Sequence, residues 1–339
     1  MRVLAVADIF IGPIALEQGL AFTPELCEDL TIREWHHNSM VDLQEDNLAV
    51  EQRGPGAIPE PPGIFDGIEE FDVLITQFCP VNADVVARAT RLKAIGVLRG
   101  GTENVDPSAE ARGIPVVASP GRNANAVAEF SVGLILAETR NIARSHHQLC
   151  QGIWGREFPN IDVIPELSGR PVGLVGMGQI GQTVARLLTA FGAEVCYFDP
   201  YVDDPTYVRE TDLAEMAAKV DVLSIHSRLS ESNYRIVSAD VIARMRPTAV
   251  LVNTARSGLV DEPALIEALR ERRIMGAAID TFDIEPLPPD SPFFALDNVT
   301  LAAHLAGTTT DALERTPRIL GPRLAQVLRD LASHKDTNG

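Results

Sequence analysis

A glycine-rich turn in the second half of the chain constrains the fold more than any other feature. The run GLVGMGQIG places Gly176, Gly178 and Gly181 in the spacing G-x-G-x-x-G, after the apolar run PVGLV and at the start of a helical stretch. In that context the glycines permit a tight turn, close approach of the backbone to a pyrophosphate, and close packing of helix on strand. The N–H groups of the first helical turn, which begins at Gln179 and Ile180, then face the anion. The turn therefore predicts a dinucleotide-binding unit.

An acidic residue follows the turn at a distance typical of such units. The strand-like run AEVCYF is followed directly by Asp199, about 20 residues beyond the glycines. A carboxylate there accepts hydrogen bonds from both ribose hydroxyls and repels a 2′-phosphate, so the sequence favours NAD over NADP. The alternative is a tight turn whose aspartate only caps a loop. Strand, turn, helix, strand and acid all occur in the required order, which favours the dinucleotide.

Short β-branched runs alternate with helical stretches on both sides of this turn, a pattern typical of parallel α/β sheets. Before the turn we expect strands at residues 2–7, 71–76, 92–98 and 114–119, and helices at residues 83–91 and 107–112. From residue 171 onwards we expect six strands, at residues 171–176, 193–199, 221–226, 248–255, 274–280 and 299–304, with helices beginning near residues 179, 212, 238 and 262. This second group predicts a doubly wound parallel sheet.

Three further segments carry predictions of their own. Residues 124–151 are expected to form one long helix, apolar in its first half. Residues 308–331 are expected to form a last helix, interrupted at Pro317 and Pro322. Residues 38–67 are rich in proline, glycine and acidic side chains, which favours an exposed loop or insertion.

The composition excludes several classes of function. A length of 339 residues favours two domains. The chain has 47 acidic and 29 basic residues, a formal net charge of −18, so neither nucleic acid nor a membrane is expected as a partner. The four cysteines lack paired spacing, so no metal site is expected. Without a secretory cleavage site or a run that could span a bilayer, the chain is expected to be cytoplasmic, with reduced thiols.

Reactive side chains follow the later strands of the second group. Arg256 follows residues 248–255, while Asp280 and His304 end the last two expected strands and Glu285 comes shortly after Asp280. An arginine fork suits a carboxylate substrate, and a histidine oriented by a carboxylate suits proton exchange with a hydroxyl or ketone. Each residue alone has a structural explanation, as a solvated cation, a strand-end histidine or an exposed acid. His226, at another strand end, is expected to line a pocket rather than to act as the acid.

These motifs resemble a known family. The runs NTARSGLVDEPAL, DTFDIEP and AAHLAG behind LVGMGQIG, together with GGTENVD and PGRNANAVAEF, resemble the D-isomer-specific 2-hydroxyacid dehydrogenases, especially their phosphoglycerate-dehydrogenase-like branch. The resemblance covers nearly the whole chain. It implies a Rossmann-type NAD-binding domain at residues 119–305, inserted into a flavodoxin-like α/β substrate-binding domain formed by residues 1–118 and 306–339, with domain closure expelling water.

The resemblance also implies roles for individual residues. Arg256 would anchor the substrate carboxylate, Glu285 would be the partner acid and His304 the general acid/base. Asp199 would hold the adenosine ribose, and Asp280 would lie beside the nicotinamide carboxamide. Further cofactor contacts are implied at Thr254, Ala255 and His304, beside Gly176, Gly178, Gln179, Ile180 and Gly181, and further substrate contacts at Arg99, Gly100 and Gly101.

The chain departs from the family pattern in the first domain. Many members carry Arg-Ser-x-Thr after the third strand, whereas this chain has Gln77, Phe78, Cys79 and Pro80. In phosphoglycerate dehydrogenases that arginine helps to bind the phosphate, so its absence argues against phosphoglycerate. Arg99 stands where the loop motif usually has glycine. Our hypothesis is that Arg99 supplies a substitute cation to the distal end of the substrate, and the alternative is a surface salt bridge.

The resemblance implies an NAD-dependent oxidoreductase that moves a hydride between nicotinamide and C2 of a small D-2-hydroxy acid or 2-keto acid, of phosphoglycerate, hydroxypyruvate/glyoxylate or sugar-acid type. A formate dehydrogenase on the same scaffold is disfavoured, because the partner of its histidine is usually glutamine and here it is Glu285. An NAD-sensing protein similar to corepressors is the alternative from another class. The apolar run FSVGLILA (residues 130–137) favours a homodimer, unless that run packs within the chain.

Overall fold

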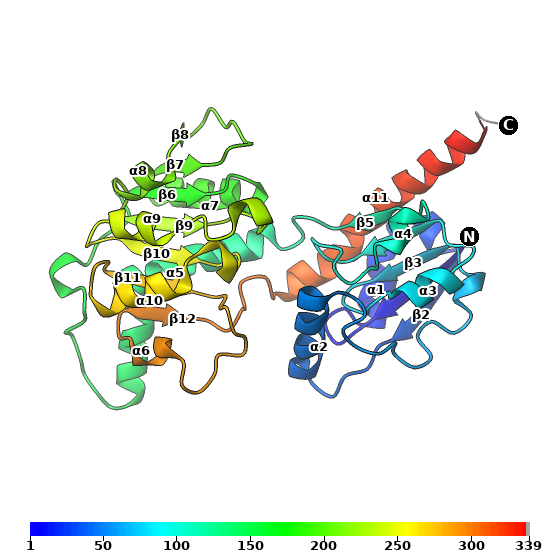
Figure 1. Cartoon of the computed structure of the whole chain (residues 1–339), viewed down its shortest axis with the longest axis horizontal. Helices are drawn as coiled ribbons and strands as arrows, with labels where there is room; N and C mark the ends of the chain where they lie inside the picture. Colours follow the sequence, from blue (N-terminus) through cyan, green and yellow to red (C-terminus); the bar gives the residue numbers. More distant parts are fainter. Residues whose placement is uncertain (337–339) are drawn as a thin grey trace. The chain divides into compact units, whose positions relative to one another are not determined.

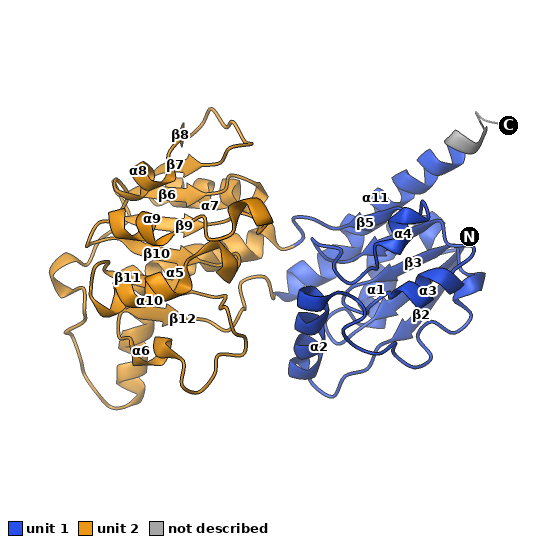
Figure 2. Cartoon of the chain, in the orientation of Figure 1, with its two compact units in different colours: residues 1–122, 309–339 blue, residues 123–308 orange. Residues whose placement is uncertain are grey.

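The structure, a computed structural model, describes residues 1–336 and consists of two compact units (Figure 1 and Figure 2). Unit 1 is formed by Met1–Arg122 together with the chain from Thr309 onwards, and unit 2 by Asn123–Thr308. The chain enters unit 2 once and leaves it once, so unit 2 is an insertion within unit 1. In the described part of the chain, no helix is both long enough and apolar enough to cross a membrane.

Unit 1 contains a five-stranded parallel sheet in the order β2-β1-β3-β4-β5, which is the flavodoxin-like order. Its strands are β1 (Arg2–Ala7), β2 (Asp29–Glu34), β3 (Val73–Thr76), β4 (Ala94–Val97) and β5 (Val116–Ala118). Its helices are α1 (Pro13–Leu20), α2 (Met40–Arg53), α3 (Ala83–Arg88), α4 (Ser108–Ala111) and α11 (Thr310–Asp336). Side chains alternate between the two faces of the sheet: Leu4 packs with Leu43 of α2, and Val3 lies in the opposite cluster with Leu320 of α11.

Unit 2 contains a seven-stranded parallel sheet in the order β12-β11-β10-β9-β6-β7-β8. Its strands are β6 (Pro171–Val175), β7 (Glu194–Phe198), β8 (Val208–Arg209), β9 (Val222–Ile225), β10 (Val250–Asn253), β11 (Gly276–Ile279) and β12 (Val299–Leu301). Its helices are α5 (Ala124–Thr139), α6 (Ile142–Cys150), α7 (Gln179–Ala190), α8 (Leu213–Ala217), α9 (Ala239–Arg244) and α10 (Glu262–Arg270). The strand order reverses between β6 and β9, so the sheet is doubly wound and the predicted fold class is confirmed.

Two of the predicted segments differ from the structure in unit 1. The segment at residues 38–67 is not simply a loop, because α2 occupies much of it. The side chain of Ser39 caps α2 by accepting a hydrogen bond from Asp42 N (3.1 Å), and Leu43 and Val50 are fully buried. The last helix is continuous through its prolines. One of them, Pro317, packs so closely on α1 that a Cβ atom on Gly19 would lie 2.6 Å from it.

The predicted helix at residues 124–151 is divided into α5 and α6. The backbone of Asn141 lies in the left-handed region (φ 57°), which ends the first helix and redirects the chain. The apolar first half packs within unit 2, against α7 and strands β10 and β11. The strands β2 and β8 were not predicted, because β2 is only partly buried and β8 is short and exposed.

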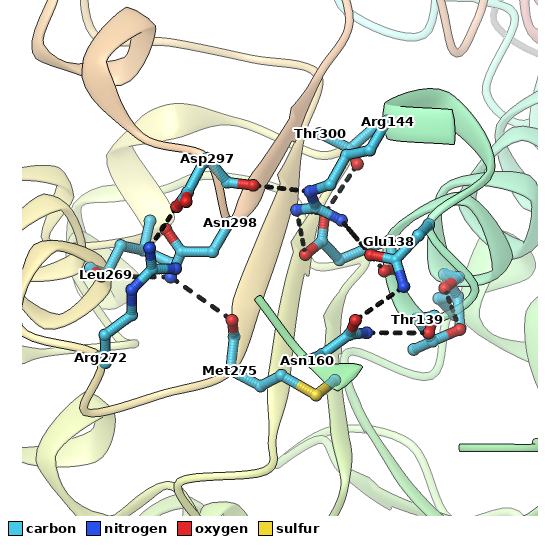
Figure 3. A network of polar contacts seen from close by, with 12 residues as sticks. Glu138, Thr139, Arg144, Asn160, Leu269, Arg272, Met275, Asp297, Asn298 and Thr300 are labelled. Atoms are coloured by element: carbon cyan, nitrogen blue, oxygen red, sulfur yellow. Dashed lines mark hydrogen bonds and ion pairs between the residues drawn. The ribbon is translucent and has the colours of Figure 1, made fainter. Parts of the chain in front are cut away.

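A buried carboxylate joins α6 to the sheet of unit 2. Arg144 Nη2 donates to both oxygens of Glu138, at 2.7 and 2.9 Å, and Thr300 Oγ1 donates to Glu138 Oε2 at 2.7 Å (Figure 3). Arg144 Nε also donates to the carbonyl oxygen of Asp297 at 2.6 Å. Burial raises the pKa of Glu138, while Arg144 and Thr300 act against that rise. A Cβ atom on Gly276 would lie 2.1 Å from Glu138 Oε1, so the carboxylate occupies space that only a glycine leaves.

We predict that Glu138→Ala lowers the free energy of unfolding by about 3 kcal/mol, because the largely buried Arg144 charge loses its carboxylate. Glu129→Ala, at an exposed position on the same helix, should change it by less than about 0.5 kcal/mol. Urea unfolding followed by circular dichroism measures both. Equal losses in the two variants would mean that the ion pair contributes nothing beyond an ordinary surface charge.

Candidate active site

The glycine turn follows β6 and has the geometry that a pyrophosphate site needs. Gly176 has a φ of +99°, and a Cβ atom there would lie 2.7 Å from Ser227 N. A Cβ atom on Gly181 would lie 2.2 Å from the carbonyl oxygen of Gly176, so helix and turn pack without space for a side chain. Gly178 precedes α7, and a Cβ atom there would meet nothing within 4 Å. The N-terminus of α7, which starts at Gln179 and Ile180, has no side-chain cap. These features fit a bound dinucleotide.

Asp199, directly after β7, accepts a hydrogen bond from the backbone of the same turn. Its Oδ2 accepts a hydrogen bond from Met177 N at 2.8 Å, and its Oδ1 accepts from Tyr201 N at 2.8 Å and Val202 N at 3.1 Å. The carboxylate is therefore held at the glycine turn by three backbone donors. One lone pair of Oδ2 is left for a hydroxyl group of a ribose.

A buried asparagine, which the sequence analysis did not single out, shapes the loop that carries Arg256. Asn253 Nδ2 donates to the carbonyl oxygen of Arg256 (2.9 Å), and its Oδ1 accepts from Ala255 N (3.0 Å). Thr254 shares a hydrogen bond of 2.7 Å with Ser131 of α5. Arg256 itself is exposed, with Nη1 donating to the carbonyl oxygen of Ala255 at 2.8 Å. The sequence signal that could have identified Asn253 is a polar residue at the end of a buried strand.

His304 and Glu285 form a direct pair. His304 Nδ1 lies 2.8 Å from Glu285 Oε2, and Glu285 Oε1 accepts a hydrogen bond from Phe282 N at 2.8 Å. Because both carboxylate oxygens are engaged, the side chain of Glu285 has one orientation. The pairing at Nδ1 leaves Nε2 of His304 for a ligand.

Asp280, fully buried at the end of β11, determines how His304 is presented. Its Oδ1 accepts a hydrogen bond from Leu305 N (2.8 Å) and its Oδ2 from Ala306 N (3.0 Å). These two bonds hold the turn in which His304 adopts a left-handed backbone (φ 52°). Burial raises the pKa of Asp280, and the two backbone bonds oppose that rise. The predicted contact of Asp280 with nicotinamide stays a prediction.

Electrostatics favours the protonated form of this histidine. The hydrogen bond that His304 donates to Glu285 raises the pKa of His304 above its ordinary value, although burial and the charge of Arg256 act against the rise. Burial alone would raise the pKa of Glu285, but the bond to His304 leaves that pKa below its usual range. The charge of Arg256 lowers the pKa of both groups. The three side chains follow the neighbouring strands β10, β11 and β12.

His226 is a different case. It is buried at the end of β9, its Nε2 lies 2.9 Å from Ser224 Oγ, and its Nδ1 has no hydrogen-bond partner among residues 1–336. Burial lowers the pKa of His226 to about 3, so the ring is neutral at physiological pH. The expected place of His226 in the lining of a pocket stays a prediction.

The remaining predicted substrate contacts lie in unit 1, in the loop after β4. Arg99 is buried: Nη1 donates to Asn47 Oδ1 (2.9 Å), and Nη2 to Glu51 Oε2 (3.1 Å). Its guanidinium also lies over the ring of Phe78, 5.0 Å from the centroid. Arg99 therefore forms a largely buried salt bridge with Glu51 of α2, and its role as a cation for the distal end of the substrate stays a prediction. Gly100 and Gly101 follow it; in the described residues no group of three His, Cys, Asp or Glu side chains could hold a metal ion.

Family models match both halves of this arrangement. The model of the D-isomer specific 2-hydroxyacid dehydrogenase NAD binding domain matches residues 132–306, and the model of the catalytic domain matches residues 34–194. The first match contains the glycine turn and both residues of the pair described above. The second contains Arg99, Gly100 and Gly101.

Individual proteins are also similar to this chain. A glyoxylate reductase from Thermofilum pendens is 40% identical over 256 residues, which cover 74% of this chain and 76% of that protein. A D-3-phosphoglycerate dehydrogenase from Methanocaldococcus jannaschii is 37% identical over 276 residues, 78% of this chain and 51% of the relative. This chain thus spans about half the length of that second protein.

Solved structures show the same fold. A protein from Thermus thermophilus is 30% identical with a TM-score of 0.74, covering 97% of both chains. An NADPH-dependent glyoxylate/hydroxypyruvate reductase from Sinorhizobium meliloti, in complex with citrate, is 26% identical with a TM-score of 0.72, covering 96% of this chain and 93% of the other. The resemblance inferred from the motifs is confirmed, and the chain belongs to the D-isomer-specific 2-hydroxyacid dehydrogenase family.

Proposed function

We propose that this protein catalyses reversible, NAD-dependent hydride transfer between nicotinamide and C2 of a small 2-keto acid, forming a D-2-hydroxy acid. The observation that carries the proposal is the His304–Glu285 pair, 2.8 Å apart, beside Arg256 on the strands that follow the glycine turn. Relatives named glyoxylate reductase and hydroxypyruvate reductase support a short substrate. A short 2-keto acid presents the two groups that these side chains can bind: a carboxylate and a ketone oxygen.

Each side chain has a definite task in the proposed reduction. A nicotinamide cofactor bound at the glycine turn supplies the hydride. Arg256 binds the carboxylate of the keto acid with its planar fork and draws electron density from the neighbouring ketone. His304 Nε2 donates its proton to the ketone oxygen, and Glu285 stabilises the charged imidazole beforehand. In the oxidative direction the neutral imidazole accepts the hydroxyl proton. Asp280 keeps the histidine in position through Leu305 and Ala306.

The cofactor is proposed to be NAD rather than NADP. Asp199 supports this choice, because its carboxylate is fixed at the glycine turn and would repel a 2′-phosphate. A similar solved structure is named as NADPH-dependent, so the preference needs measurement in this chain. All four cysteines are free thiols, which supports the further proposal of a cytoplasmic location, where thiols stay reduced.

The first experiment measures oxidation of NADH and NADPH by the purified protein with glyoxylate, hydroxypyruvate, 3-phosphohydroxypyruvate and four-carbon 2-keto acids. We expect turnover with at least one short keto acid and a preference for NADH. We also expect His304→Ala to lower kcat by about 10²–10⁴-fold while NADH still binds, since a proton donor contributes that much. His36→Ala, an exposed histidine of unit 1, is the matched control. Tight NADH binding without any turnover would contradict the proposal and favour a corepressor-like role.

The pH profile tests the Glu285–His304 pair. Reduction needs protonated His304, so kcat/KM for a keto acid should fall as the pH rises through the pKa of His304, which the pair raises above its ordinary value. In Glu285→Gln that support is lost, and the fall should occur at lower pH. Asp290→Asn, in the exposed part of the same loop, should leave the profile where it is. An unshifted profile in Glu285→Gln would show that the carboxylate does not set the proton affinity of His304.

We also propose a homodimer, but through another surface than FSVGLILA, half of whose residues are buried within unit 2. None of the residues of α6 is buried, and α6 together with the chain that follows it exposes several large apolar side chains. Trp154 is 82% exposed, and the others are Ile142, Leu149, Ile153, Ile161, Val163 and Ile164. Exposed apolar groups at this density are typical of an interface.

We predict that Trp154→Glu converts a wild-type dimer into a monomer in size-exclusion chromatography with light scattering, because a charge would be buried in the interface. Tyr201→Glu is the control, since Tyr201 is 88% exposed and belongs to unit 2 without being part of this surface. A wild-type monomer, or a Trp154→Glu dimer as stable as the wild type, would exclude this interface.

A further inference from the structure

Glu262, the first residue of α10, lies between two loops of the candidate active site and has no part in the catalytic scheme above. Its Oε2 accepts a hydrogen bond from Asp283 N at 3.0 Å, in the loop that carries Glu285. Glu262 also lines a narrow cavity beside Asn253, which shapes the loop that carries Arg256. Its side chain therefore connects the loops that follow β10 and β11, both within unit 2.

The N-terminus of α10 fixes the backbone of Glu262. The preceding residue, Asp261, caps the helix by accepting a hydrogen bond from Ala264 N (3.2 Å), and Asp261 N donates to the carbonyl oxygen of Val237 (3.0 Å). Leu265, in the first turn of the helix, is 2% exposed and packs in the core of unit 2. The carboxylate of Glu262 thus starts from a rigid helix end, so a bond to it also restrains its partner.

The loop after β11 uses two carboxylates to hold two consecutive N–H groups. Phe282 N donates to Glu285 Oε1 at 2.8 Å, and Asp283 N donates to Glu262 Oε2 at 3.0 Å. The ring of Phe282 is buried, whereas Asp283 and Ile284 are exposed. Because the exposed pair has little packing, the bond to Glu262 restrains the backbone just before Glu285.

The surroundings of Glu262 are unfavourable for its charge. Burial raises the pKa of Glu262, and the charges of Asp283 and Glu285 raise it further, while the backbone bond from Asp283 opposes the rise. The ionised carboxylate is therefore less stable here than in water. An amide would accept the same hydrogen bond without the repulsion. Side chains that lower stability in this way are expected mainly at functional sites.

We propose that Glu262 is a positioning residue, which holds the loop after β11 so that Glu285 stays bonded to His304. The inference rests on the proposed function, in which His304 Nε2 gives its proton to the keto acid. In this scheme Glu262 touches neither substrate nor cofactor, and it acts through Asp283 N. When its bond is lost, the loop is free to move, and the bond of 2.8 Å between Glu285 and His304 is no longer maintained. The imidazole then loses both its orientation and part of its proton affinity.

The experiment compares Glu262→Ala with Glu262→Gln in the full chain. Alanine removes the acceptor for Asp283 N, whereas the side-chain oxygen of glutamine retains it. With the best keto acid, Glu262→Ala should lower kcat about 10-fold, the value of one hydrogen bond to a charged group, and leave KM for NADH unchanged. Glu262→Gln should retain most of the wild-type kcat. Glu267→Ala, at an exposed position of the same helix, is the matched control and should retain all of it.

A purely structural role of Glu262 gives a different pattern. A negative charge at the first position of a helix interacts favourably with the helix dipole, and this interaction is lost in the alanine and glutamine variants alike. Equal kcat and equal Tm in the two variants would therefore overturn the inference. A Glu262→Ala variant with the wild-type kcat would also overturn it.

A second readout is independent of turnover. The pKa of His304 is measured by NMR titration of the imidazole, whose signal is identified by its absence in His304→Ala. Glu262→Ala should lower this pKa from its raised wild-type value, while Glu262→Gln and Glu267→Ala should leave it nearly unchanged. A Glu262→Ala variant with the wild-type pKa would overturn the inference, whatever its activity. If the protein turns over no keto acid but shows this shift, the proposed function fails and the positioning of His304 by Glu262 holds, so the two failures are distinguishable.

Discussion

Parallel pairing of the strands in both sheets determines where the candidate functional side chains lie. Each strand of a parallel sheet needs a crossover before its neighbour, so all strands end at one edge. Arg256, Asp280 and His304 are far apart in the chain but follow the adjacent strands β10, β11 and β12. The glycine turn follows β6 in the same sheet. The reactive groups are therefore brought to one edge by backbone hydrogen bonding, before any contact between their side chains is made.

Buried polar side chains then refine what the sheet brings together. Asn253 and Asp280 have no reactive role in the scheme; they accept or donate backbone hydrogen bonds and hold the loops that carry Arg256 and His304. Glu138 holds α6 in a similar way, and α6 carries part of the proposed dimer surface (Figure 3). In each case a single buried group satisfies several donors or acceptors at once. Such groups are costly to remove, because the partners left behind are themselves buried.

Two arginines near the carboxyl edge of the sheet in unit 1, Arg99 and Arg122, have different surroundings. Arg99, proposed from the sequence as the distal cation, is already bound by two residues of α2. Arg122 received no role from the sequence, yet its Nη1 lacks a partner among residues 1–336. The helix that binds Arg99 lies in a stretch whose prolines and glycines favoured a loop.

The sequence by itself determined the α/β class, the dinucleotide turn, the family, and the identity of Arg256, Glu285 and His304 as candidates. It could do so because hydrophobic periodicity and glycine spacing are local signals. Only the tertiary structure decided which polar groups are satisfied: that Asp280 holds the turn at His304, that Arg99 is already paired, and that Gln77 and Nη1 of Arg122 have no partner among residues 1–336. Hydrogen bonding and desolvation depend on neighbours that are distant in the chain, and these are known only after the strands have paired.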